Sequence, residues 1–392
     1  MEDTPSLLNL FFSFLRLGLT AFGGPAMVRY IKDLSCKKNR WVQPDDFDHG
    51  IALVQTIPGA TAMQAAAYAG LKARGGAGAI VAFTGFALPA FFLMVALAWA
   101  YKRAMNISLV VSCFSGLKVI VVAIVANATL GFGKKMIRKW QDVLLFLLSA
   151  VYLYFKGSPV VAIVACGALG LFLYRDVVGG TKSSELNIKA IIASPENRRV
   201  LGWAGFVAFF AALVLALLYL VNPFLLKLSG IMMKVDFFAY GGGYASLPLM
   251  LHEIVEKRAL LEKTVFMDGI ALGQVTPGPI VITAAFVGYL LKGIIGAAIC
   301  AWAIFTPSLF MLMFTSPFFD GFKEAPPFKR AMRGVLASFV GLLLAVFLSF
   351  FIAVKWNVAS GVIGAAAFFA LYKKIDILWV VLVAAAVSAI IL

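Results

Sequence analysis

The chain has 392 residues, of which 62% are hydrophobic and only 13% are charged. A soluble domain averages about 25% charged residues, so this composition excludes a protein whose surface lies mostly in water. The net charge is +16, and the cations lie mostly in short segments between apolar runs, as in membrane proteins. We therefore expect a lipid bilayer around the chain and no nucleic-acid partner, and the positive excess favours an anionic solute.

The first half of the chain is expected to comprise residues 1–175. In chain order we predict a first helix, a polar interfacial stretch, a broken segment, two long helices and two shorter apolar helices, over residues 6–28, 29–49, 50–72, 76–100, 107–131, 143–155 and 158–174. The two long runs exceed the roughly 20 residues that cross the hydrocarbon core of a bilayer. The two short runs are expected to be tilted or to cross incompletely.

A polar linker and one extra helix separate the halves over residues 176–222, with the helix expected at 200–221. The second half, residues 223–392, repeats the order of the first, over residues 223–250, 252–267, 268–291, 293–316, 331–354, 358–372 and 376–392. This order predicts an all-α polytopic membrane protein of two homologous halves, with about 10–13 membrane-embedded helices. If the broken segment crosses the membrane the halves are inverted repeats, and if it returns to the same side they are parallel.

One motif occurs twice. Residues 51–60 read IALVQTIPGA and residues 270–279 read IALGQVTPGP, so that six of the ten positions are identical at an offset of 219. Glycines precede both copies, and a basic residue followed by a small-residue step follows each. Matching interruptions in two halves are typical of secondary transporters.

The two breaks, Pro58-Gly59 and Pro277-Gly278-Pro279, each interrupt an apolar segment. Proline removes a backbone donor and glycine permits conformations that other residues resist. Because freed backbone groups are not left facing lipid, such breaks lie inside protein or beside a water-filled cavity. A half-helix beginning after a break would direct its amides at an anion. The alternative interpretation is a packing kink.

Several polar side chains and glycines near the breaks are candidate substrate-binding groups. Gln55 and Gln274 precede the prolines by three residues, and they either orient an oxyanion or satisfy the broken backbone. Glycines upstream of each break either expose backbone amides to substrate or allow close helix packing. The further candidates are Gln64, Thr276, Gly23, Gly24, Gly242 and Gly243.

Arg16 and Lys234 occupy equivalent places upstream of the glycines, each within apolar sequence. A cation at mid-bilayer costs about 2.5–3.5 kcal/mol on insertion scales. Each either snorkels to the interface or provides a fixed positive site for an anionic substrate. Asp236 is a possible partner for another element, whereas Asp45, Asp48 and Asp268 border the broken segments, where they either cap helices or carry coupling protons.

The sequence contains no pattern that favours catalysis. It has no nucleophile elbow, no phosphate-binding glycine loop and no histidine-rich metal set. The four cysteines are widely spaced, which argues against a disulfide framework or a zinc site. We therefore expect no enzyme, no cofactor and no metal.

Two sets of residues resemble the long-chain chromate transporters. The second-half set is Gly241 to Ala245, Leu247 to Leu249 and Gly273 to Thr283. The first-half set is Phe14 to Gly18, Phe22 to Pro25 and Gln55 to Gly59, and the resemblance covers nearly the whole chain. Ala60 departs from this pattern, since a proline is usual there.

The resemblance implies a secondary active transporter of the cytoplasmic (inner) membrane that exports chromate, a tetrahedral dianion close in shape to sulfate. Single-half relatives work as pairs inserted in opposite orientations, which favours inverted repeats and leaves a homodimer open. The substrate would lie between the two breaks, with charge from Arg16 and Lys234 and hydrogen bonds from Gln55, Gln274 and backbone amides. The rival hypotheses are a sulfate or other oxyanion carrier, an anion channel, and a membrane enzyme or scaffold.

Overall fold

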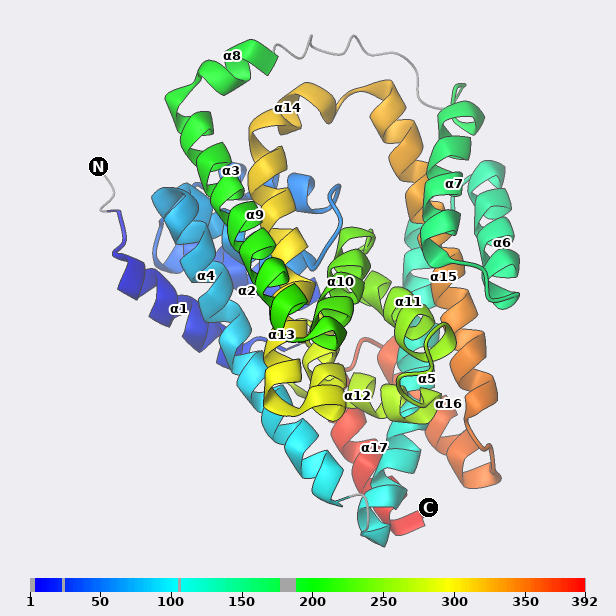
Figure 1. The fold of residues 1–392 in the computed structure, drawn as a ribbon. Helices are drawn as coiled ribbons and strands as arrows, with labels where there is room; N and C mark the ends of the chain where they lie inside the picture. Colours follow the sequence, from blue (N-terminus) through cyan, green and yellow to red (C-terminus); the bar gives the residue numbers. More distant parts are fainter. Residues whose placement is uncertain (1–3, 23–24, 105–106, 177–187, 392) are drawn as a thin grey trace.

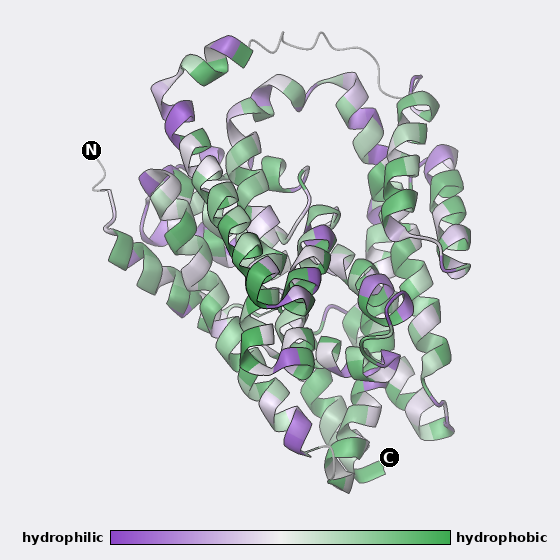
Figure 2. Ribbon diagram, in the orientation of Figure 1, coloured by the Kyte–Doolittle hydropathy of each residue, from purple (hydrophilic) through white to green (hydrophobic). Residues whose placement is uncertain are grey.

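The computed structural model describes residues 4–22, 25–104, 107–176 and 188–391 (Figure 1). All regular elements in these ranges are helical. Five of the described helices are long and apolar enough to cross a membrane, namely Thr61–Ala104, Val110–Met136, Pro195–Val221, Ile280–Phe322 and Pro326–Ala353. Figure 2 shows apolar residues along most of the helices and hydrophilic ones mainly at helix ends and in turns, as expected for a multi-pass membrane protein.

The first half contains seven α-helices and one π-helical turn within the described residues. They are α1 (Leu7–Thr20), α2 (Pro25–Lys32), the π-helix η1 (Asp33–Lys38), α3 (Pro44–Val54), α4 (Thr61–Ala104), α5 (Ser108–Met136), α6 (Trp140–Tyr154) and α7 (Pro159–Leu173). Two further helices, α8 (Ile188–Ala193) and α9 (Pro195–Val221), lead to the second half.

The second half repeats this series. Its elements are α10 (Pro223–Phe237), the 3₁₀ turn η2 (Gly243–Ala245), α11 (Ser246–Met250), the π-helix η3 (Leu251–Glu256), α12 (Lys263–Val275), the 3₁₀ turn η4 (Ile280–Ile282), α13 (Thr283–Thr315), η5 (Ser316–Phe318), α14 (Phe319–Phe322), α15 (Pro326–Ala353), α16 (Val358–Tyr372) and α17 (Ile377–Ile391).

The prediction of single helices over 6–28 and 223–250 is wrong. The first ends at Thr20, and a new helix begins at Pro25, a residue suited to the first turn of a helix. The second ends at Phe237, because Gly241 and Gly242 have φ of 108° and 87°, outside the helical region. Each first segment therefore contains two separate helices, α1 and α2 in the first half and α10 and α11 in the second.

The long helices α4 and α13 each contain a sharp turn at the same place. Arg74-Gly75 and Lys292-Gly293 have non-helical dihedral angles, and both glycines have positive φ, of 65° and 62°. The two turns lie 218 residues apart in the sequence. Around each turn, paired glycines bring the arms together, since a Cβ on Gly70 or Gly288 would overlap a backbone carbonyl of the opposite arm. The predicted boundary between the broken segments and the long helices is therefore confirmed.

The halves are interlocked and run in opposite directions. Helices α6 and α7 of the first half pack against α15, while α16 and α17 of the second half pack against α5. A second group is formed by α1 on α4, α10 on α13, and α4 on α13. In Figure 1 α15 descends from α14 to α16, whereas its counterpart α5 rises toward α6. Equivalent helices thus point in opposite directions, as in inverted repeats.

Candidate functional site

The two breaks pair reciprocally with the opposite half. The backbone N–H of Gly59, in the first break, donates to the carbonyl of Ala239 at 3.0 Å. The N–H of Gly278, in the second break, donates to the carbonyl of Ala21 at 2.9 Å. Ala21 and Ala239 lie 218 residues apart and each follows the first helix of its half. Both breaks are therefore held where the two halves meet.

Both break glycines adopt conformations that only glycine takes readily. Gly59 has φ of 118° and Gly278 has φ of 105°. A Cβ on Gly59 would overlap the Ser308 hydroxyl, and one on Gly278 would lie 2.7 Å from the Ala90 Cβ. Ala90 and Ser308 are repeat counterparts, since they lie 218 residues apart. The prolines Pro58, Pro277 and Pro279 are buried at this junction.

Gln64 stabilises the first break from within. Its side chain is fully buried, and its amide Nε2 donates to the carbonyl of Pro58 at 2.7 Å and to that of Ser308 at 3.4 Å. Its Oε1 is buried without a hydrogen-bond partner. The N–H of Ala60 donates to the Ser308 hydroxyl at 3.0 Å. Gln64 thus satisfies broken backbone in this conformation, and it leaves one polar atom free.

The other break-region candidates differ between the halves. Gln55 is exposed, whereas its counterpart Gln274 is half-buried and has a buried, unpartnered amide nitrogen. The buried Thr276 hydroxyl donates to the carbonyl of Gly273 at 3.0 Å. A Cβ on Gly242 would lie 2.9 Å from the hydroxyl of Thr61, so this loop approaches the start of α4. Gln274 is therefore the candidate with a free donor.

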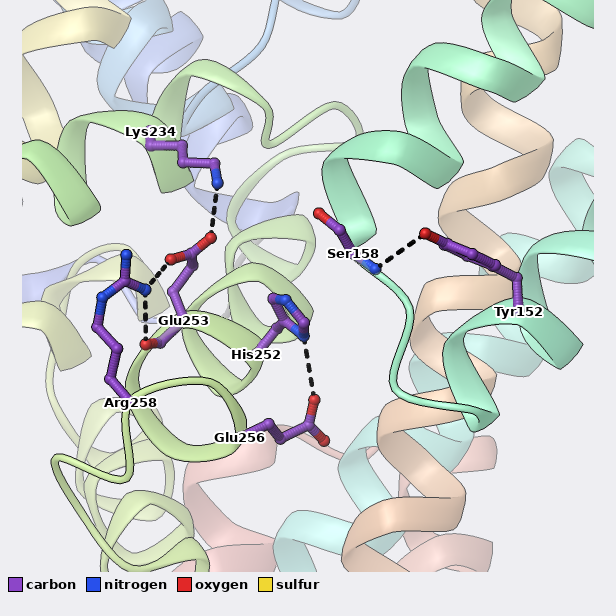
Figure 3. A network of polar contacts seen from close by, with 7 residues as sticks. All are labelled: Tyr152, Ser158, Lys234, His252, Glu253, Glu256 and Arg258. Atoms are coloured by element: carbon purple, nitrogen blue, oxygen red, sulfur yellow. Dashed lines mark hydrogen bonds and ion pairs between the residues drawn. The ribbon is translucent and has the colours of Figure 1, made fainter.

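Lys234 is neutralised by a buried acid. Its Nζ lies 2.6 Å from Oε1 of Glu253, a residue that is only 2% exposed (Figure 3). Arg258 also pairs with the Glu253 carboxylate and donates to its backbone carbonyl at 3.1 Å. His252, on the same π-helix, lies 3.3 Å from Glu256. In this conformation Lys234 is part of an ion cluster rather than a free positive site.

Arg16, the counterpart of Lys234, lies on an exposed part of α1. Its side chain has no ion-pair partner among the described residues. Gly23 and Gly24 lie outside the described residues. Gly243 is described and packs near the side chains of Ile280 and Val281.

Asp268, predicted to border the second broken segment, has two partners that were not predicted from the sequence. Asp268, 1% exposed, accepts a hydrogen bond from the hydroxyl of Tyr101 at 2.9 Å, and Lys118 Nζ lies 3.6 Å from it. Lys118 stands in the middle of the apolar run 107–131, and this lone cation is the signal that would have found the contact. His49, the repeat counterpart of Asp268, instead lies 2.8 Å from Asp320, which is the counterpart of Lys102 and not of Lys118.

Helix α12 and its repeat counterpart α3 pack differently. Helix α12 packs against α5, α15 and α17, and Asp268 of α12 thereby meets Lys118 of α5. Its repeat counterpart α3 packs chiefly on α4.

The residues that the structure describes contain no group of three or more His, Cys, Asp or Glu side chains placed to hold a metal ion.

A family model described as Chromate transporter matches residues 8–171 and again residues 226–389. The chain belongs to the chromate transporter family. The double match confirms the two homologous halves, and the predicted resemblance is also confirmed. Membership of this family and the long apolar helices together identify a multi-pass membrane protein.

Similar proteins cover most of the chain. A protein of Methanocaldococcus jannaschii named Uncharacterized transporter MJ0718 is 43% identical over 391 residues, covering 100% of this chain and 96% of that protein. The Chromate transport protein of Cupriavidus metallidurans is 28% identical over 345 residues, covering 87% and 81%. The Chromate transport protein of Pseudomonas aeruginosa is 29% identical over 346 residues, covering 86% and 79%. No solved structure matches the chain.

Proposed function

We propose that the chain is a secondary active transporter that exports chromate across the cytoplasmic membrane. The observation that carries this proposal is the reciprocal pairing of the two breaks, Gly59 with Ala239 and Gly278 with Ala21. It holds two interrupted segments at the junction of oppositely directed halves, in a chain whose relatives include proteins named for chromate transport. Transporters of inverted repeats bind substrate at such a junction.

The proposed substrate position lies between the helix starts that follow the breaks. Helix α4 begins at Thr61, and the second break leads through η4 to Thr283 at the start of α13. Helix N-termini present free amides and a positive dipole end, both of which favour an oxyanion. The free Gln274 amide nitrogen adds a neutral donor. Arg16 and Lys234 would contribute positive charge, Lys234 after release from Glu253.

We propose that the two repeats comprise residues 1–175 and 223–392, inserted in opposite orientations. Alternating access would then release the packing of α12 on α5 and form the corresponding packing of α3, which here packs chiefly on α4. The group of α1, α4, α10 and α13 would rock against the group of α5 to α7 and α15 to α17.

Flux of labelled chromate in proteoliposomes tests the proposal, with pH gradients of both signs and sulfate as competitor. We expect saturable flux. Gln274→Leu should raise the KM at least about tenfold, the effect of about 1.4 kcal/mol, and the matched variant Gln55→Leu should have a smaller effect because Gln55 is exposed. Strong sulfate competition would indicate a general oxyanion carrier, non-saturating flux a channel, and no flux from folded protein would reject transport of these anions.

A further inference from the structure

Asp236 is a buried carboxylate near the first break. It is 1% exposed, and its Oδ2 accepts hydrogen bonds from both the N–H and the hydroxyl of Ser308, each at 2.7 Å. Its Oδ1 is also buried but has no hydrogen-bond partner. A buried carboxylate is normally paired with a cation or fully hydrogen-bonded, and this one is neither.

Asp236 and Ser308 both differ from the residues at the corresponding positions of the first repeat. At the offset of 218, the counterpart of Asp236 is Gly18 and that of Ser308 is Ala90. The first half has no room for a larger residue there, since a Cβ on Gly18 would lie 2.6 Å from the carbonyl of Phe86. The second half thus carries a carboxyl and a hydroxyl that contact each other where the first half carries glycine and alanine.

Among the described residues, no cation forms an ion pair with this carboxylate. On α10 itself Lys227 is exposed and Lys234 pairs with Glu253. Of the helices packed against α10, α11 has no ionisable residue, and α9 carries its charges near its start, at Glu196, Arg198 and Arg199. Helix α13 carries Tyr289, Cys300 and Lys292, whose ammonium lies over the ring of Phe224.

Asp236 is connected to the first break through one hydroxyl. The Ser308 hydroxyl donates a hydrogen bond to Asp236 and accepts one from the N–H of Ala60 at 3.0 Å. Ala60 lies one residue before α4 begins. An ionised Asp236 therefore adds negative charge next to a helix N-terminus that would otherwise favour an anion. Protonation would remove that charge, with Oδ1 free to carry the proton.

We propose that Asp236 is a proton-binding site and that its protonation favours oxyanion binding at the first break. By reciprocity, a bound oxyanion raises the proton affinity of Asp236, so the oxyanion and the proton are transported together. This inference rests on the proposed function. One proton leaves a dianion with one net negative charge, so an inside-negative membrane potential still drives the pair out of the cell.

Two variants test this site. Asp236→Asn keeps an acceptor for Ser308 but cannot titrate. The double variant Asp236→Gly with Ser308→Ala reproduces the pair Gly18 and Ala90, which the first half already accommodates. In proteoliposomes we expect wild-type chromate flux to carry protons and to rise at least about tenfold over roughly two pH units in the acidic direction. Both variants should exchange chromate without moving protons, and that exchange should be independent of pH. The proposal would be overturned if both variants moved protons with chromate and responded to pH as the wild type does.

Infrared difference spectroscopy on the purified protein separates this inference from the proposed function. A carboxylic-acid band that titrates in the wild type and is missing in Asp236→Asn would support the proton site, even if no chromate or sulfate moves. Identical titrating bands in both proteins would overturn it. Absence of flux for both anions with the band present would instead count against the proposed function alone.

Discussion

The Gly59 N–H donates to the carbonyl of Ala239 at 3.0 Å, and thereby fixes the first break to the loop that ends the first helix of the other half. The corresponding bond of the other half, from the Gly278 N–H to the carbonyl of Ala21, fixes the second break in the same way. Each half therefore supplies the acceptor that the other half's interrupted backbone needs. In a membrane interior, where water does not replace such a partner, this exchange accounts for the tolerance of the breaks.

Gly59→Ala should lower stability and abolish transport. The alanine would have to adopt φ of 118° with its Cβ overlapping the Ser308 hydroxyl, and strain of this kind costs about 1–3 kcal/mol. Thermal unfolding of purified protein measures the effect. The control is Gly131→Ala in α5, where an added Cβ meets no heavy atom within 4 Å. Equal melting temperatures for the two variants would contradict the structure.

Lys234→Met should destabilise the protein, because Glu253 is buried and would keep only Arg258 as its cationic partner. Lys234 is itself partly exposed, which limits the loss to about 1–3 kcal/mol. Adding Glu253→Gln should recover part of the lost stability, and unfolding of the single and double variants measures the coupling.

Arg16→Ala removes an unpaired side chain and should leave stability unchanged. Its chromate KM then tests the proposed charge role without a folding effect.

Acid should remove a stabilising contribution of Asp142, in the first turn of α6. Burial opposes ionisation of this group, but hydrogen bonds from Arg333, Tyr174 and the amides of Arg138 and Lys139 outweigh it and lower the pKa from 3.8 to about 2. Because the folded-state pKa is lowered, the contribution is complete above the unfolded value and is lost as pH falls toward about 2. We expect the melting temperature to fall between about pH 5 and pH 2 more steeply in the wild type than in Asp142→Asn. Parallel curves would show that Asp142 contributes nothing to acid sensitivity.

Lys118→Met should slow transport and destabilise the contact between α5 and α12. It removes the cation beside Asp268 and leaves the carboxylate with only the Tyr101 hydroxyl, at a cost of about 1–3 kcal/mol. Combining it with Asp268→Asn should restore stability, since the buried charge is then gone as well. A transport rate and melting temperature unchanged by Lys118→Met would mean that the 3.6 Å contact has no energetic role.

The sequence predicts the repeats and the breaks because both are local patterns. Apolar runs mark the long helices, and the Pro-Gly pairs and the glycines at positions 75 and 293 mark where the chain changes direction. The division of each first segment into two helices was missed, since Pro25 and Gly241 lie within runs that are mostly apolar. The partners of Gly59, Lys234 and Asp268 were not predictable, because spacing along one chain does not say which distant element lies opposite.

The interlocked packing of α6 and α7 on α15 has a consequence for biosynthesis. When the ribosome has made the first half, the surface on which these two helices rest has not been translated. They must wait in the bilayer, held by lipid or by an insertase, until α15 emerges more than 150 residues later. The last helices, α16 and α17, then complete the covering of α5, so assembly of the first half finishes only when synthesis of the second does.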